Sequence, residues 1–153
     1  MSGLNDLYQE ILLEHNSKPR NFKSLEDANQ ISEGYNPLCG DQITLALKVV
    51  DGVIDDVGFQ GSGCAISRAS ASMMTEAIMD KSIEEARKIF DAFHNLLTSS
   101  QNEDVDVKLL GDLEFLGGVV QYPVRIKCAT LSWHTLGVAL DSQQPGGQTV
   151  LDE

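Results

Sequence analysis

The sequence is short of basic residues and has no long apolar run. Its 153 residues include 11 Lys and Arg against 23 Asp and Glu, which gives a net charge of -12. This charge repels nucleic acid and anionic membrane surfaces at long range, so neither is an expected partner. No stretch approaches the roughly 20 apolar residues needed to cross a bilayer, and the first residues lack the pattern of a signal peptide. We therefore expect a soluble, cytoplasmic protein.

Proline and cysteine are also scarce, with four and three residues respectively. The length and the 42% hydrophobic content suit one sizeable core, so we predict a single domain over residues 1–153. Pro145-Gly146-Gly147 predicts a flexible C-terminal tail from about residue 142. Three cysteines cannot all pair with one another, and a reducing compartment disfavours structural disulfides. Metal binding, catalysis and inert burial remain as roles for them.

The apolar pattern predicts a hairpin among several helices. β-branched residues on both sides of Asp51-Gly52 indicate an antiparallel hairpin over residues 43–59. Ser82 and Glu85 form a capping-box pattern, which opens a helix that ends near Leu97. Further helices are predicted from Leu4 to the breakers Asn16-Ser17-Lys18-Pro19, at 65–79 and at 129–140. Loops are predicted at 20–36 and 98–106, a short helix or turn at 109–120, and an extended segment at 122–124. The fold class is α+β.

Cys39-Gly40-Asp41 places a thiol and a carboxylate two residues apart. In an extended loop the side chains of residues i and i+2 point the same way, and the glycine permits a tight bend. Both groups can then reach one ion. The alternative is a loop cysteine that happens to stand beside a turn aspartate.

Cys64 and Cys128 each stand just before or at the start of a predicted helix. Unpaired backbone N–H groups and the helix dipole favour a thiolate there, and a thiolate binds metal and attacks sulfur. Arg125 and Lys127 precede Cys128 and add positive charge. The alternative for each cysteine is a small buried side chain without chemistry.

Three thiolates and one carboxylate complete a tetrahedral ligand set for Zn²⁺, which accepts sulfur and oxygen ligands. We therefore predict a metal site formed by Cys39, Asp41, Cys64 and Cys128. Such a site carries excess negative charge. Three positive side chains either compensate this negative charge or are simply solvated: Arg68, Arg125 and Lys127. The three histidines lack ligand spacing to the cysteines, so we expect them to pack or to meet solvent: His15, His94 and His134.

The segments around the three cysteines resemble the motifs of the IscU/NifU-like proteins of iron-sulfur cluster assembly. They are Gly34-Tyr35-Asn36-Pro37-Leu38-Cys39-Gly40-Asp41, Gly61-Ser62-Gly63-Cys64-Ala65-Ile66-Ser67 and Arg125-Ile126-Lys127-Cys128-Ala129. Lys127 stands where the IscU scaffolds have a histidine, and the stretch between the last two cysteines is longer, which resembles the SufU branch. The resemblance covers nearly the whole chain. It implies a small antiparallel sheet, the hairpin plus one further strand, packed against several helices.

For the SufU branch the resemblance implies a zinc-dependent sulfurtransferase. Such a protein takes persulfide sulfur from a cysteine desulfurase of the SufS type, a pyridoxal-phosphate enzyme, and downstream Suf assembly proteins are further expected partners. Cys39 is the expected sulfur acceptor, because it lies in a glycine-flanked loop while Cys64 and Cys128 are held on helices. The alternatives are a scaffold on which an iron-sulfur cluster is assembled and transferred, and a zinc ion that serves folding alone.

Overall fold

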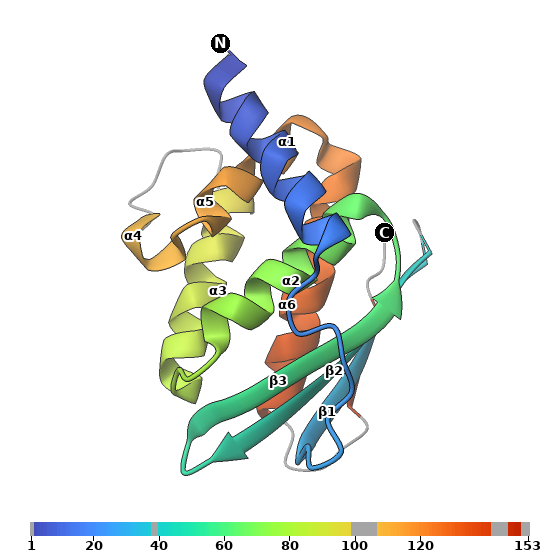
Figure 1. Cartoon of the computed structure of the whole chain (residues 1–153), viewed down its shortest axis with the longest axis vertical. Coiled ribbons are helices and arrows are strands. Elements are labelled where there is room, and N and C mark those ends of the chain that lie inside the picture. The colour runs from blue at the N-terminus through green and yellow to red at the C-terminus, as the bar shows by residue number, and fades with distance from the viewer. Residues whose placement is uncertain (1, 38–39, 99–106, 142–146, 151–153) are drawn as a thin grey trace.

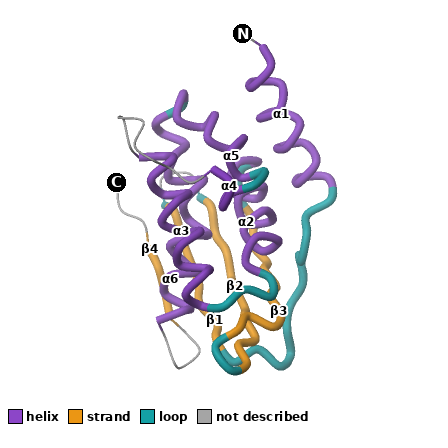
Figure 2. Tube along the Cα trace, turned by 90° about the vertical axis from the view of Figure 1, so that its left-hand side faces the viewer, coloured by secondary structure: helices purple, strands orange, loops and turns teal. Residues whose placement is uncertain are grey.

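A layer of helices covers one face of a small sheet. The computed structural model describes residues 2–37, 40–98, 107–141 and 147–150. Figure 1 shows the helices stacked on the sheet, and Figure 2 shows the two layers from the side. The predicted α+β class, with helices packed against a small sheet, is confirmed. Among the described helices, none is long and apolar enough to span a bilayer.

The sheet has the strand order β3-β2-β1-β4 in the described residues. Its strands are β1 Gln30–Asn36, β2 Asp41–Val50, β3 Val53–Ser62 and β4 Gly147–Val150. β2 pairs antiparallel with both β1 and β3, whereas β4 runs parallel to β1. The predicted hairpin is β2–β3. Its turn residues Asp51 and Gly52 have φ values of 53° and 78°, and two positive φ angles are what a type I′ turn requires.

β1 lies in a segment that the sequence analysis assigned to a loop, and that assignment was wrong. Ser32, Glu33 and Gly34 have weak strand propensity, but the backbone groups of β1 are satisfied by pairing with β2. Gly34 faces helix α6 (Ile126–Asp141), and a Cβ atom there would overlap the Thr135 hydroxyl. The glycine therefore lowers the strand signal and at the same time lets α6 lie close to the sheet.

The C-terminal segment also differs in part from the expected flexible tail. Residues 147–150 form β4, which pairs with the edge that β1 would otherwise expose. The remaining residues from 142 onward lie outside the described part of the chain. So does the predicted loop over 98–106, apart from Thr98, which is the last residue of α3.

The helices begin and end close to the predicted positions. They are α1 Ser2–Ser17, α2 Ala65–Ile78, α3 Ile83–Thr98, α4 Val107–Leu110, α5 Leu113–Leu116 and α6, with the 3-10 helices η1 Gly117–Gln121 and η2 Pro123–Arg125. The capping box is confirmed, because the backbone N–H of Glu85 donates to the Ser82 hydroxyl and that of Ser82 donates to the Glu85 carboxylate, both at 3.0 Å.

Two helical boundaries differ from the predictions. Pro123 opens the 3-10 helix η2 where an extended segment was expected, since its fixed φ also suits a first helical position. α6 begins at Ile126, three residues earlier than predicted, so Cys128 lies inside its first turn. The core between the two layers includes Met73 and Met74, with exposures of 3% and 0%.

The end of α1 is joined to α2 by a buried histidine. His15 Nδ1 lies 2.7 Å from the Ser72 hydroxyl, which also accepts the backbone N–H of Arg20 at 2.8 Å. Since the hydroxyl oxygen accepts from Arg20, its hydrogen is available to donate to Nδ1, and the ring is neutral in this arrangement. Burial lowers the pKa of His15, and the nearby Arg20 lowers it further.

We expect the free energy of unfolding to fall as the pH drops below about 6.5. The unfolded chain then protonates His15, whereas the folded chain resists protonation because the pKa is lowered. Stability is therefore complete above the unfolded pKa and is lost progressively below it, by at most about 1.4 kcal/mol per pH unit for one group. Urea unfolding of the wild type and His15→Gln between pH 5 and 8 measures this effect. The His94→Gln variant is the control. If the free energy of unfolding fell equally steeply with pH in the wild type and in His15→Gln, the prediction would be contradicted.

Candidate metal centre

Asp41 is placed by the tight connection between β1 and β2. Gly40 has φ 77° and its N–H donates to the carbonyl oxygen of Asn36 at 2.8 Å. This left-handed turn delivers Asp41 as the first residue of β2, with its side chain fully buried. Cys39, the predicted sulfur acceptor and fourth ligand, lies outside the described residues.

The two carboxylate oxygens of Asp41 have different surroundings. Oδ1 accepts the backbone N–H of Cys64 at 2.9 Å. Oδ2 is buried and accepts no hydrogen bond from the described residues. Leaving a buried carboxylate oxygen without a partner is costly, and a cation is one way to satisfy it. The donor chemistry of Asp41 therefore fits a metal ligand.

Cys64 is the N-cap of α2. Its backbone is extended, with φ -73° and ψ 171°, and its Sγ accepts the N–H of Ser67 at 3.5 Å. The pKa of Cys64 is lowered to about 6, chiefly because the Cys128 side chain donates a hydrogen bond to it. Burial raises the pKa in opposition, and the Ser67 N–H lowers it. The thiolate expected at this helix start is therefore the favoured form near neutral pH.

Cys128 meets these two residues from the other side. It lies in the first turn of α6, its side chain is fully buried, and the Asn36 side-chain nitrogen is 4.0 Å from its Sγ. The ligand atoms of Asp41, Cys64 and Cys128 all lie within 4.8 Å of one another. Tetrahedral zinc separates its ligand atoms by about 3.5–3.8 Å, so a small contraction brings these three onto one ion.

Three elements distant in sequence thus converge at one end of the sheet. Figure 1 shows the beginning of α2 and the beginning of α6 at the end of the sheet where β3 finishes. The cluster of potential ligands in the described residues contains none of the three histidines. His94 and His134 instead lie ring to ring, with centroids 5.9 Å apart. The expectation that they pack rather than bind is consistent with this contact.

Supporting residues around the cluster were not singled out from the sequence. Asn36 reaches Cys128 from a strand that was itself missed, so no local signal marks it. Ser67 could have been anticipated, because an N-cap side chain accepts from the N–H three residues later. Arg68, considered as a compensating charge, has its guanidinium 5.5 Å from the ring centroid of Phe22.

Gly63 is required by the position of the Asp41 carboxylate. A Cβ atom on Gly63 would lie 2.6 Å from Asp41 Oδ1. We expect Gly63→Ala to displace the carboxylate, to break its bond to Cys64 and to lower the free energy of unfolding by about 1–3 kcal/mol. Urea unfolding measures the change. The control is Gly137→Ala in α6, where the added Cβ meets its nearest neighbour at 3.4 Å, so stability is expected to stay constant or to rise. Equal stabilities of Gly63→Ala and the wild type would disprove the role of Gly63.

Comparison with known proteins gives a consistent family. The chain is 40% identical over 146 residues to a protein of Bacillus subtilis (strain 168) named zinc-dependent sulfurtransferase SufU, covering 95% of this chain and 97% of that protein. It is 41% identical over 134 residues to the iron-sulfur cluster assembly scaffold protein IscU of Thermotoga maritima, covering 88% and 92%. Both similarities extend across residues 41, 64 and 128 because they cover most of the chain.

The fold agrees with solved structures of the same group. A crystal structure described as a putative iron-sulfur cluster assembly scaffold protein for the SUF system, from Fervidobacterium islandicum AW-1, is similar with a TM-score of 0.81 and 34% identity, covering 88% of this chain and 96% of that one. The family described as the NifU-like N-terminal domain matches residues 7–129. The chain therefore belongs to the NifU-like N-terminal domain family, within which SufU and IscU proteins are its relatives.

Proposed function

We propose that this protein is a zinc-dependent sulfurtransferase that accepts persulfide sulfur from a cysteine desulfurase for iron-sulfur cluster biogenesis. The observation that carries the proposal is the cluster of Asp41, Cys64 and Cys128, in which one buried carboxylate oxygen accepts no hydrogen bond from the described residues. The Bacillus subtilis relative, which is named a zinc-dependent sulfurtransferase, is similar to this chain over 95% of its length, and this similarity supports the proposal. Free thiols persist in a reducing compartment, so a cytoplasmic location is part of the proposal.

Cys39, Asp41, Cys64 and Cys128 are the proposed zinc ligands. Zinc, when bound, keeps coordinated thiols deprotonated at neutral pH. Cys64 is held by the N-terminus of α2 and Cys128 by α6, and Asp41 is fixed by its bond to the Cys64 N–H. In sequence, Cys39 lies between β1, which ends at Asn36, and β2, which begins at Asp41. Its departure from the ion would leave the contacts named above for Asp41, Cys64 and Cys128 in place, which supports Cys39 as the sulfur acceptor.

Sulfur transfer then follows as a thiolate exchange. The Cys39 thiolate attacks the terminal sulfur of the donor's persulfide, forming a new S–S bond while the donor's S–S bond breaks. The donor cysteine leaves as a thiolate, so no external oxidant or reductant is needed. The other three ligands would hold the ion in place. The Cys128 thiol is fully buried and the Cys64 thiol half-buried, so neither is as open to a large donor protein as a surface thiol would be.

The proposed partner is a cysteine desulfurase of the SufS type, which carries pyridoxal phosphate. Exposed apolar side chains flank two of the ligand-bearing segments: Tyr35 in β1 is 44% exposed, and Tyr122 and Val124 before α6 are 49% and 64% exposed. Large exposed apolar residues close to a reactive site are typical of an interface. Downstream Suf assembly proteins are the proposed recipients of the sulfur.

Metal content and desulfurase turnover test the proposal together. Protein purified without added metal is expected to contain about one zinc ion per chain, and to increase the turnover of a SufS-type desulfurase. A second candidate is a cluster scaffold, which the name of the Thermotoga maritima relative favours. Iron with labile sulfide, visible absorbance and no increase in turnover would select the scaffold and reject sulfur transfer.

A further inference from the structure

A small hollow lies between the end of β3 and the first turns of α2. Its volume is about 210 Å³, and it is lined by Gln42, Ile43, Phe59, Gln60, Gly61, Ser62, Ser67, Arg68 and Ala71. This volume includes space that is open to solvent, so the enclosed part of the hollow is much smaller and has no room for a whole cofactor. The lining is rich in amide and hydroxyl groups around one cation. The hollow therefore suits one small polar group.

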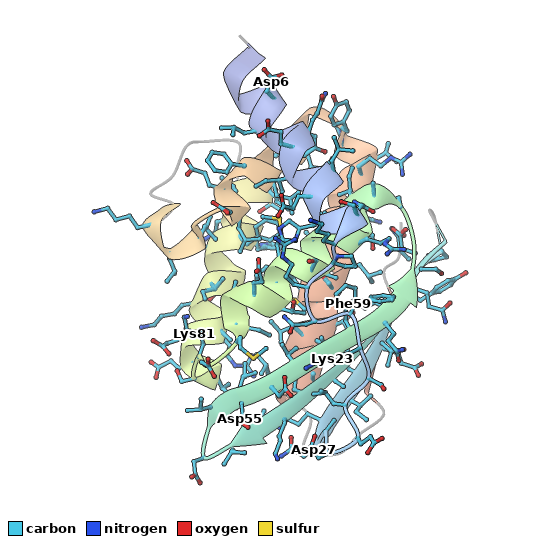
Figure 3. The ribbon with its side chains drawn as sticks, viewed as in Figure 1. Asp6, Lys23, Asp27, Asp55, Phe59 and Lys81 are labelled. Carbon is cyan, nitrogen blue, oxygen red and sulfur yellow. The ribbon has the colours of Figure 1, made fainter. Side chains whose placement is uncertain are left out.

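Arg68 is held rigidly at this hollow. Its guanidinium lies over the ring of Phe22, at 5.5 Å from the centroid, and Phe22 packs edge-on against Phe59 with centroids 5.2 Å apart. Phe59 is also fixed, since its N–H donates to the carbonyl oxygen of Asn21 at 3.0 Å. Figure 3 labels Phe59 and Lys23 where the segment after α1 crosses β3. A cation stacked on such a ring loses little further freedom when it binds a ligand.

The charge of Arg68 has no carboxylate partner among the described residues. Four other cations, in contrast, form ion pairs: Arg20, Lys23, Lys48 and Arg87. Arg68 Nε is buried and has no hydrogen-bond partner among the described residues. In a chain of net charge -12, a half-buried arginine without an ion pair in the described part of the structure is unusual. Its guanidinium can therefore bind an anionic group that reaches the hollow.

The hollow is distinct from the cluster of potential metal ligands. Arg68 lines the hollow, whereas Asp41, Cys64 and Cys128 are not among its lining residues. Arg68 follows Cys64 by four residues on α2, which corresponds to about 6 Å along the helix axis. A ligand in the hollow would therefore contact Arg68 without replacing a ligand of the metal.

We propose that the hollow is a subsite for a single carboxylate group, bound by the Arg68 guanidinium one helical turn from Cys64. The planar fork of a guanidinium matches the two oxygens of a carboxylate. Phosphate sites usually gather several cations or backbone N–H groups, whereas Arg68 is the one cationic side chain in the lining. The carboxylate belongs to a free amino acid or to an acidic side chain of a docked protein. The subsite does not depend on sulfur transfer.

NMR of the arginine side chains tests the proposal on the full-length, zinc-loaded chain. The sequence has four arginines, Arg20, Arg68, Arg87 and Arg125, so the Nε–H signals are few, and Arg68→Lys assigns one of them by its loss. We expect sodium acetate to shift the Arg68 signal in a saturable way, and sodium chloride at equal ionic strength to leave it unchanged. The internal control is Arg87, which pairs with Asp141 on the surface. Equal responses to acetate and chloride, or equal responses of Arg68 and Arg87, would overturn the proposal.

Substitution of the cation gives a second measurement. The backbone amide of Ser62, in the lining, is expected to report acetate binding in the wild type, with the affinity at least about tenfold weaker in Arg68→Met and Arg68→Gln. Unchanged affinity in both variants would contradict the subsite. Titration with L-alanine and titration with the desulfurase distinguish the two possible sources of the carboxylate. A shift of the Arg68 signal by L-alanine identifies a free amino acid, whereas a shift by the desulfurase that excludes acetate identifies an acidic side chain.

Discussion

Asp41→Asn is expected to weaken zinc binding by about 100-fold or more and, at the same time, to stabilise the metal-free protein. The carboxylate is fully buried, and one of its oxygens accepts no hydrogen bond in the described part of the chain. Its negative charge also opposes the nearby Cys64 thiolate, because it raises the pKa of Cys64. Asparagine removes the charge and keeps an oxygen that accepts the Cys64 N–H. In the metal-free protein, removal of this buried negative charge is expected to raise the free energy of unfolding by about 1–3 kcal/mol.

Two measurements separate these opposite effects. Competition with a chromophoric chelator gives the zinc affinity, and urea unfolding in excess chelator gives the stability of the metal-free chain. The control is Asp27→Asn, because Asp27 forms an exposed ion pair with Lys48 and is expected to change stability by less than about 1 kcal/mol. If the Asp41→Asn variant had wild-type zinc affinity, the carboxylate would not be a ligand. If it were less stable than the wild type without metal, the buried charge would not destabilise the metal-free chain.

Cys39→Ser is expected to abolish sulfur acceptance while it leaves zinc bound. Serine has no thiolate to attack a persulfide, so the increase in desulfurase turnover should fall by about 100-fold or more. Asp41, Cys64 and Cys128 remain within 4.8 Å of one another and retain three ligands for the ion. Mass spectrometry after alkylation checks for the added sulfur on the chain, and metal analysis checks for zinc.

The matched comparison is Cys64→Ser. This variant removes a thiol from the N-cap of α2, so both zinc and sulfur acceptance are expected to be lost. A difference in zinc content between the two variants therefore distinguishes the sulfur acceptor from a positioning ligand. If Cys39→Ser carried added sulfur at the wild-type rate, the accepting thiol would be another cysteine.

Local chemistry explains which elements could be predicted. The turn at Asp51-Gly52 needs two positive φ angles, and the capping box of Ser82 and Glu85 satisfies two backbone N–H groups within four residues. Both signals are written within a few neighbouring residues. Their elements were accordingly predicted at nearly the observed positions.

Elements that depend on distant partners could not be predicted in the same way. β1 contains Gly34, which weakens a strand locally, but its position is fixed by β2 on one side and by Thr135 of α6 above it. Likewise, β4 exists through its pairing with β1. These contacts span up to about a hundred residues in sequence, and no short pattern records them.

The candidate site shows the same division. The residue types and the helix starts indicated that Cys64 and Cys128 are thiols suited to metal, but their approach to Asp41 is a tertiary fact. The hollow at Arg68 is also tertiary, because Phe22 and Phe59 come from separate segments. The chemical types of the candidate ligands could therefore be predicted from the sequence, whereas the distances between them depend on tertiary packing.

The order of the three clustered ligands along the chain sets when the centre is completed during synthesis. Asp41 and Cys64 leave the ribosome well before Cys128, which follows Cys64 by 64 residues (128 - 64). At about 5–20 residues per second this interval lasts roughly 3–13 s. Strands β1 to β3 and helices α2 and α3 are synthesised before Cys128, whereas β4 follows it. The proposed ion can therefore meet all three clustered ligands only after most of the sheet has been synthesised, when the first turn of α6 is added.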